Sequence, residues 1–160
     1  MKFFVCLLLF NFLFISNVNG NNRVIIYKEK RILNVVSPSE EIIKSFRISL
    51  GGVPCGHKQC EGDQKTPEGK YTLKYVNENS SYYRSIFINY PNEKDKKSAK
   101  KLNCPPGGMI MIHGIRNNLG WMGFFHTFFD WTKGCIAIKN SQIDELISML
   151  KLPAEIIINP

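Results

Sequence analysis

One histidine and one cysteine, each at the edge of an apolar run, strongly limit how this chain can fold. His113 follows the run Met109–Ile112, and Cys135 precedes the run Ile136–Ile138. A thiol is a useful nucleophile only as its thiolate, and a free thiol, with a pKa of about 8.5, needs a nearby base or cation to lose its proton at neutral pH. His113 is such a base, but it stands 22 positions before Cys135. The two side chains therefore meet only if the two apolar runs form neighbouring strands.

The chain from Arg23 onward has the pattern of a mainly β domain. The segment Arg23–Val36 holds two apolar runs around a polar turn, and the segment Ser45–Leu50 alternates, so the three together predict an antiparallel meander. A glycine-rich loop is predicted at 51–69. Further strands are predicted at 71–76, 85–90 and 155–159. A helix is predicted between an N-cap at Ser141, with Asp144 at the capping-box position, and Pro153; its apolar face holds Ile143, Leu146, Ile147 and Leu150.

Residues 1–20 are typical of a secretory signal peptide. Lys2 gives a positive start, and Phe3–Ile15 is apolar apart from Asn11. This run is short for a membrane span, which needs about 20 apolar residues. An uncleaved membrane anchor is the alternative, and Cys6 lies too early for lipid attachment after cleavage. We expect a periplasmic or secreted protein without membrane attachment, formed by a single domain over residues 21–160.

The chain is basic, which limits its partners. Its formal net charge of +8 falls to +7 when Lys2 is removed with the leader. For an exported protein, an anionic cell-envelope polymer is a more suitable partner than nucleic acid. No nucleic acid is expected, because the aromatic residues do not interleave with lysines on any predicted strand. The five lysines between Lys94 and Lys101 are interpreted as a solvated loop.

The four cysteines after residue 20 leave more than one interpretation open. Cysteines of exported proteins are usually disulfide-bonded, and Cys55, Cys60, Cys104 and Cys135 allow three complete pairings. If Cys135 stays free, Cys55 and Cys60 form the natural small-ring disulfide, and Cys104 is left unpaired. Metal binding by Cys55, His57 and Cys60 is the other alternative, although this segment lacks a fourth ligand and the usual zinc spacing.

Two sequence motifs resemble those of the L,D-transpeptidase catalytic domain family (YkuD-like). In that family a strand-terminal His-Gly is followed by Ser/Thr-x-Gly-Cys, and DWTKGCIA at 130–137 is similar to the form in a secreted Gram-negative subgroup. GDQKTPEGKY at 62–71 matches a second motif. Both stand in the family's order, so the resemblance covers nearly all of 21–160. It implies a mainly β, sandwich-like or barrel-like sheet with one helix on the C-terminal side, and no metal or cofactor.

The resemblance implies a specific set of site residues. It assigns Cys135 as the nucleophile and His113 as the general base, with the carbonyl of Gly114 orienting the imidazole ring. The backbone N–H groups of Gly134 and Cys135 are the expected oxyanion donors, because the tetrahedral intermediate places negative charge beside the sulfur. Thr132 is expected to form a hydrogen bond near the site.

Other residues near these motifs have less specific interpretations. His126 lies in an aromatic stretch that is more typical of a lid or core segment than of a catalytic base. Trp121 and Trp131 either wall a groove or are buried. Residues of the second motif are interpreted as scaffold, because Asp, Thr and Gly hold turns by local hydrogen bonds and φ freedom; they are Asp63, Thr66 and Gly69.

The chain departs from the family at two positions next to the cysteine. Many relatives carry His two positions before it and Arg or Asn two positions after it, where this chain has Lys133 and Ala137. Lys133 is a hypothetical replacement that favours either the thiolate or an acidic group of the substrate. Asn140, five positions after Cys135, matches the family.

The resemblance implies acyl transfer on peptidoglycan stem peptides. The Cys135 thiolate attacks the carbonyl of the diamino acid at stem position three, releases D-alanine and forms a thioester. An amine of another stem then gives a 3–3 cross-link, or water gives a carboxypeptidase product. Some relatives instead act on the bond between peptidoglycan and an envelope lipoprotein. A disulfide-stabilised envelope-binding module that has lost the reaction is the alternative from a different class.

Overall fold

The computed structural model describes residues 20–160, except the side chains of Met122 and Phe124. The expected signal peptide at 1–20 therefore lies almost wholly outside the described residues. Within 20–160, no helix combines the length and the apolar character needed to span a membrane. The described strands are β1 Arg23–Tyr27, β2 Ile32–Val36, β3 Ile42–Arg47, β4 Gly69–Ser80, β5 Tyr83–Ile88, β6 Met111–His113, β7 Ile136–Ala137 and β8 Ala154–Asn159.

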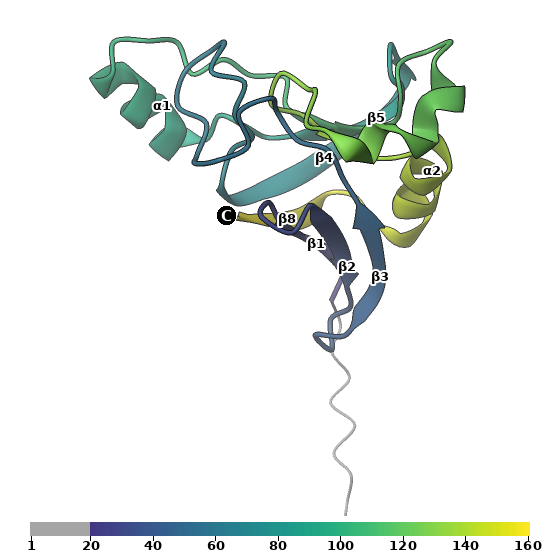
Figure 1. The fold of residues 1–160 in the computed structure, drawn as a ribbon. Coiled ribbons are helices and arrows are strands. Elements are labelled where there is room, and N and C mark those ends of the chain that lie inside the picture. The colour runs from purple at the N-terminus through teal and green to yellow at the C-terminus, as the bar shows by residue number, and fades with distance from the viewer. Residues whose placement is uncertain (1–19) are drawn as a thin grey trace, which may run out of the picture.

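The eight strands form one curled, mixed sheet in the order β3-β2-β1-β8-β4-β5-β6-β7. β1, β2 and β3 form the predicted antiparallel meander, but β3 lies at Ile42–Arg47, earlier than the strand predicted at 45–50. The last strand, β8, pairs parallel with β1 and antiparallel with β4, so the C-terminal strand joins the two halves of the sheet. Figure 1 shows the sheet bending between these halves, with the two α-helices at opposite ends. The expectation of a mainly β fold is confirmed.

Alternating apolar residues build the core from the centre of the sheet. In β8 the side chains of Ala154, Ile156 and Ile158 are buried, while the residues between them are only partly buried. In β1, Val24 and Ile26 follow the same alternation and are fully buried. Each buried valine or isoleucine among them contributes about 1.5–3 kcal/mol relative to exposure. The core thus fixes the strand register on which the positions of later residues depend.

The lysine-rich segment forms a helix, so its interpretation as a solvated loop is wrong. Helix α1 spans Glu93–Lys101. The side chain of Asn92 accepts hydrogen bonds from the N–H groups of Lys94 and Asp95, and Asp95 in turn accepts one from Asn92 N. This capping box and the burial of Asp95 and Ala99 on one face outweigh repulsion among lysines on the solvated face. The single predicted helix is therefore one of two α-helices in the described chain.

The predicted C-terminal helix is present, but its start differs. Helix α2 spans Asn140–Met149, so Ser141 lies in its first turn and is not the N-cap. The N–H of Lys139 donates instead to Gln142 Oε1 at 3.0 Å. The side chain of Asn140 contacts the segment after β6, where its Oδ1 accepts a 2.8 Å hydrogen bond from Ile115 N. The residue that matches the family thus ties the start of α2 to the segment after His113.

The predicted disulfide between Cys55 and Cys60 is wrong, because Cys60 is bonded to Cys104. Glu61 N donates to Pro105 O at 2.7 Å, so the 51–69 loop runs beside the segment after α1. This contact brings the Cα atoms of Cys60 and Cys104 to 5.7 Å, within the range for a disulfide. Cys55 remains exposed and free. Proximity in space has decided the pairing, not proximity in sequence.

Candidate active site

Strands β6 and β7 bring the predicted nucleophile and base to one face of the sheet. The strands are parallel, with Ile112 opposite Ile136 and His113 opposite Ala137. Cys135 stands directly before β7 and two positions before Ala137, so alternation places its side chain on the face that carries His113. The prediction that the two apolar runs are neighbouring strands is confirmed.

The imidazole of His113 is buried and held in one orientation. Its Nδ1 lies 2.7 Å from the carbonyl oxygen of Gly114, and a carbonyl only accepts, so Nδ1 carries the proton and Nε2 carries the lone pair. The rings of Tyr82 and Trp131 pack against it at centroid distances of 4.6 and 5.7 Å. Burial lowers the pKa of His113 below its ordinary 6.5, although the Gly114 bond acts in the opposite direction. At neutral pH the ring is therefore uncharged and able to accept a proton.

The sulfur of Cys135 is reduced, as expected, and its surroundings favour the protonated thiol. Sγ donates to the carbonyl oxygen of Met109 at 3.5 Å. Burial raises the pKa of Cys135 above the ordinary 9.0, against the opposing effects of the Met111 backbone and the charge of Lys58. The raised pKa favours the thiol over the thiolate in the free protein, because burial disfavours an isolated anion. The proton must leave as the sulfur attacks.

The turn before Cys135 is shaped by Thr132 and Gly134. Thr132 Oγ1 donates to Cys135 O at 2.7 Å and accepts from Gly134 N at 3.1 Å. Gly134 has a φ of +119°, a conformation that favours glycine. Thr132 is thus close to the site, as expected. In the free protein, the N–H of Gly134 already has a partner in the Thr132 hydroxyl.

The second motif supports this turn through the backbone of Gly51 and Gly52. Thr66 Oγ1 accepts from Gly51 N at 3.2 Å, and Gly52 N donates to Thr132 O at 3.0 Å. Asp63 accepts hydrogen bonds from Lys58 Nζ and from three backbone N–H groups, those of Gln59, Cys60 and Lys65. Gly69, at a φ of +123°, opens β4. These contacts agree with the scaffold interpretation of Asp63, Thr66 and Gly69.

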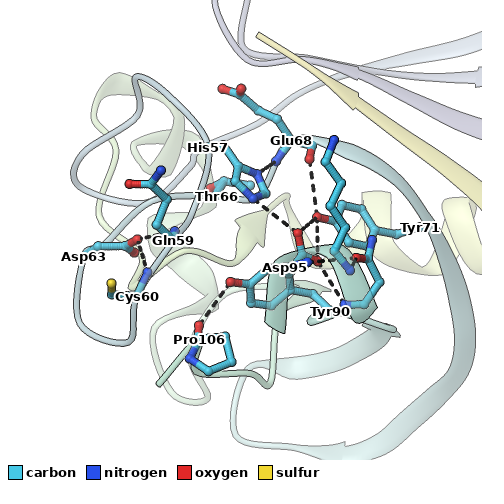
Figure 2. A network of polar contacts seen from close by, with 12 residues as sticks. His57, Gln59, Cys60, Asp63, Thr66, Glu68, Tyr71, Tyr90, Asp95 and Pro106 are labelled. Atoms are coloured by element: carbon cyan, nitrogen blue, oxygen red, sulfur yellow. Dashed lines mark hydrogen bonds and ion pairs between the residues drawn. The ribbon is translucent and has the colours of Figure 1, made fainter. Parts of the chain in front are cut away.

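A buried polar network fixes the same loop to α1 and β4 (Figure 2). His57 Nε2 lies 3.2 Å from Asp95 Oδ1, and His57 Nδ1 accepts from Glu68 N at 2.9 Å. Tyr71 Oη donates to the same Asp95 carboxylate. With Cys60 in a disulfide and His57 in this network, the proposed Cys-His metal site does not form. Residues 20–160 hold no group of three or more His, Cys, Asp or Glu placed to bind a metal ion.

Two hollows flank the His113 and Cys135 positions. The first, which we name the apolar cavity, has a volume of about 310 Å³ and is lined by Tyr82, Ile115, Arg116, Leu119, Phe125, His126, Phe129 and Trp131. The second, which we name the lysine groove, has a volume of about 450 Å³ and is lined by Lys58, Glu61, Gly62, Gln64, Gly107, Gly108 and Lys133. The first shares Tyr82 and Trp131 with the His113 ring, and the second lies beside the cysteine turn.

The remaining candidate residues differ in where they lie relative to these two hollows. Lys133 is exposed in the lysine groove, and Trp131 is a wall of the apolar cavity, whereas Trp121 is 75% exposed and lines neither hollow. His126 is buried in the apolar cavity wall, within the 3₁₀ helix η2 His126–Phe128 that follows η1 Gly120–Phe124. Sequence reasoning missed Tyr82 and Arg116. No sequence motif marks either residue as part of the site, because only the folded chain brings them to this cavity.

Comparisons with known proteins agree with this fold. The family model described as the YkuD L,D-transpeptidase catalytic domain matches residues 21–158. YafK of Escherichia coli K12, named as a candidate L,D-transpeptidase, is 28% identical over 130 residues, which cover 78% of this chain and 45% of YafK. The chain therefore spans less than half of that relative.

Solved structures also resemble this chain in fold. The helical cell shape determining protein Pgp2 of Campylobacter jejuni matches with a TM-score of 0.66 and 26% identity over 86% of this chain and 48% of Pgp2. An L,D-transpeptidase of Mycobacterium smegmatis shares the fold, with a TM-score of 0.56 and 12% identity over 88% of this chain and 59% of that protein. Because the family match covers almost the whole described region, the chain belongs to the L,D-transpeptidase catalytic domain family.

Proposed function

We propose that this protein is an exported peptidoglycan L,D-transpeptidase that uses Cys135 as its nucleophile. The main support is one relationship: a reduced cysteine and a neutral histidine, whose Nδ1 is fixed by Gly114, lie on one face of a parallel strand pair. A binding module would have no need for an oriented base beside a free thiol. The similarity to Pgp2, a helical cell shape determining protein, is consistent with a role of this chain in the cell wall.

In the proposed acylation step, Nε2 of His113 takes the thiol proton as Sγ of Cys135 attacks a carbonyl carbon. That carbonyl belongs to the diamino acid at stem position three. The C–S bond forms, and the carbonyl oxygen becomes an oxyanion that the backbone N–H of Cys135 stabilises; the N–H of Gly134 can join it only by leaving the Thr132 hydroxyl. When the intermediate collapses, the C–N bond breaks and the imidazolium gives its proton to the leaving nitrogen. D-Alanine departs and a thioester on Cys135 remains.

In the deacylation step, an incoming nucleophile reverses these roles. His113 Nε2 takes a proton from an amine of another stem as that amine attacks the thioester carbon, and the C–S bond then breaks. The sulfur recovers the proton, and the product is a 3–3 cross-link. Water in place of the amine gives L,D-carboxypeptidase activity, and a lipoprotein–stem bond as substrate gives an amidase. The geometry around the sulfur is the same for all three.

Two features support an exported location. Residues 1–20 have the pattern of a signal peptide, which leaves residues 21–160 as the catalytic domain. The Cys60–Cys104 disulfide is of a kind that persists in oxidising compartments such as the periplasm. Peptidoglycan stems are found in that location.

Incubation with purified muropeptides followed by mass analysis tests the proposal. The wild-type protein is expected to release D-alanine, and joined stems indicate transpeptidation, whereas unjoined tripeptides indicate hydrolysis. Cys135→Ala is expected to be inactive, while Cys55→Ser, which removes the other described free thiol, is expected to retain full activity. A carbapenem is expected to add its mass to Cys135 alone. An active Cys135→Ala protein would exclude the cysteine mechanism.

A further inference from the structure

Two polar side chains line the apolar cavity with nitrogen atoms that lack a partner in the described chain, one exposed to solvent and one buried. The first is Arg116, whose exposed guanidinium makes no hydrogen bond or ion pair within residues 20–160. A guanidinium presents a planar fork of donors that matches the two oxygens of a carboxylate. An unpaired arginine in the wall of an otherwise apolar cavity therefore favours a ligand with a free carboxylate.

The second group is the ring of His126. Ser49 Oγ donates to the backbone oxygen of His126 and lies 3.4 Å from its Nδ1, where it can accept the Nδ1 proton. This leaves Nε2 as an acceptor, and Nε2 is buried without a partner within residues 20–160. Burial, and after it the charge of Lys139 and the proximity of the titratable His113 ring, lower the pKa of His126 to about 4, so the ring is neutral at neutral pH. A buried acceptor without a donor is unusual and points to a ligand that supplies one.

The reaction itself determines which part of the substrate reaches this cavity. The protonated base must give its proton to the leaving nitrogen, so the residue after the scissile bond lies on the histidine side of the sulfur. The rings of Tyr82 and Trp131 contact His113 and also line the cavity. The cavity therefore begins beside the two rings that contact His113, the base that serves the leaving nitrogen, and the lysine groove remains for the stem that becomes acylated.

We propose, resting on the function proposed above, that the apolar cavity is the subsite for the leaving amino acid and that Arg116 and His126 determine its specificity. Arg116 pairs with the free α-carboxylate. His126 Nε2 accepts a hydrogen bond from the leaving nitrogen and holds it toward His113. The side chain of the amino acid lies among the apolar residues Ile115, Phe125 and Phe129. The volume of about 310 Å³ is at the lower end of small-molecule pockets, roughly 300–1,000 Å³.

Two matched substrates test the role of Arg116. One is a stem tetrapeptide with a free C-terminal carboxylate, and the other is the same peptide with a C-terminal amide. For the wild-type protein, kcat/KM is expected to be about tenfold or more higher on the acid, the size of one charge-assisted hydrogen bond. In Arg116→Gln this preference disappears because only the rate on the acid falls. The charge-matched control Lys101→Gln, on the solvated face of α1, is expected to keep the preference.

The role of His126 is tested by a pair of variants. His126→Leu removes the acceptor, so the rate of acylation is expected to fall. His126→Gln retains an acceptor oxygen and is expected to recover part of the rate. Thermal melting of each variant separates loss of contact from loss of fold. Equal rates for folded Leu and Gln variants would overturn the assignment of His126.

The outcomes distinguish this proposal from the proposed function. If the wild-type protein releases no amino acid from either substrate and forms no adduct on Cys135, the proposed function fails. If the wild-type protein is active but Arg116→Gln lowers the rates on acid and amide equally, or changes neither, the subsite assignment fails and the proposed function stands. Competition gives an independent measure: D-alanine is expected to inhibit the wild-type protein more strongly than D-alaninamide, and Arg116→Gln is expected to remove this difference.

Discussion

Gly134 lies against the backbone carbonyl of Lys65, so the turn that carries Cys135 rests directly on the second motif. A Cβ added to Gly134 would lie 2.6 Å from Lys65 O, which is backbone and cannot move aside as a flexible side chain would. The φ of +119° at Gly134 adds a second obstacle. The two motifs of the sequence are thus one physical unit, and changes in either should alter the cysteine.

Gly134→Ala is expected to lower the free energy of unfolding by about 1–3 kcal/mol and to abolish turnover, because steric overlap and backbone strain displace Cys135. Chemical denaturation and muropeptide turnover measure the two effects. Gly62→Ala is the control, since Gly62 also has a positive φ, +81°, but an added Cβ meets nothing within 4 Å. It should show the smaller loss of stability. Equal losses in both variants would mean that the Lys65 contact has no effect.

The disulfide should stabilise the walls of the lysine groove, because Cys60 precedes Glu61 on one wall and Cys104 precedes Gly107 on the other. Closing a 44-residue separation is expected to contribute about 3–4 kcal/mol. Cys104→Ser should therefore lower the melting temperature, and a reductant should lower it in the wild-type protein but not in this variant. Peptide mapping should find Cys60 joined to Cys104. A Cys55–Cys60 peptide would contradict the pairing.

The pH profile of kcat/KM should fall on its acid side at an unusually low pH. Burial holds the pKa of His113 below 6.5, and the base works only when neutral, so kcat/KM should fall with acidity through a midpoint below 6.5. Burial holds the pKa of Cys135 above 9.0, so alkylation of the free protein by iodoacetamide should be slow at neutral pH and rise through a midpoint above 9.0. Fast alkylation that does not change between pH 6 and 9 would instead indicate a thiolate–imidazolium pair at rest.

Lys133 should act on the substrate and not on the thiol. Its side chain is exposed in the lysine groove, and the lysine whose charge lowers the pKa of Cys135 is Lys58. Lys133→Ala is expected to raise KM about tenfold, equivalent to about 1.4 kcal/mol, while kcat and the pH profile of alkylation stay unchanged. Lys133→Arg should restore KM in part. An altered alkylation profile in the alanine variant would assign Lys133 to the thiol.

Sequence reasoning failed where a local pattern competed with contacts from distant residues. The charge density of Lys94–Lys101 suggests a loop, yet the helix forms because its Asn92–Asp95 capping box and its buried face satisfy the backbone. The short spacing of Cys55 and Cys60 suggests a ring, yet the bridge goes to Cys104 because a neighbouring segment packs against Glu61. The capping signal was readable in the sequence, but the packing that decided the bridge was not.

The sequence by itself determined the alternation of apolar residues, the order of most strands, and the two motifs that identify His113 and Cys135. The alternation and the strands depend on local periodicity. The motifs depend on residue types that few other reactions require together. Only the tertiary structure decided the disulfide partner, the raised pKa of the Cys135 thiol, and the joining of Arg116 and His126 to one cavity. Desolvation and side-chain contacts come from residues far apart in the chain, and the closure of the sheet through β8 sets how they meet.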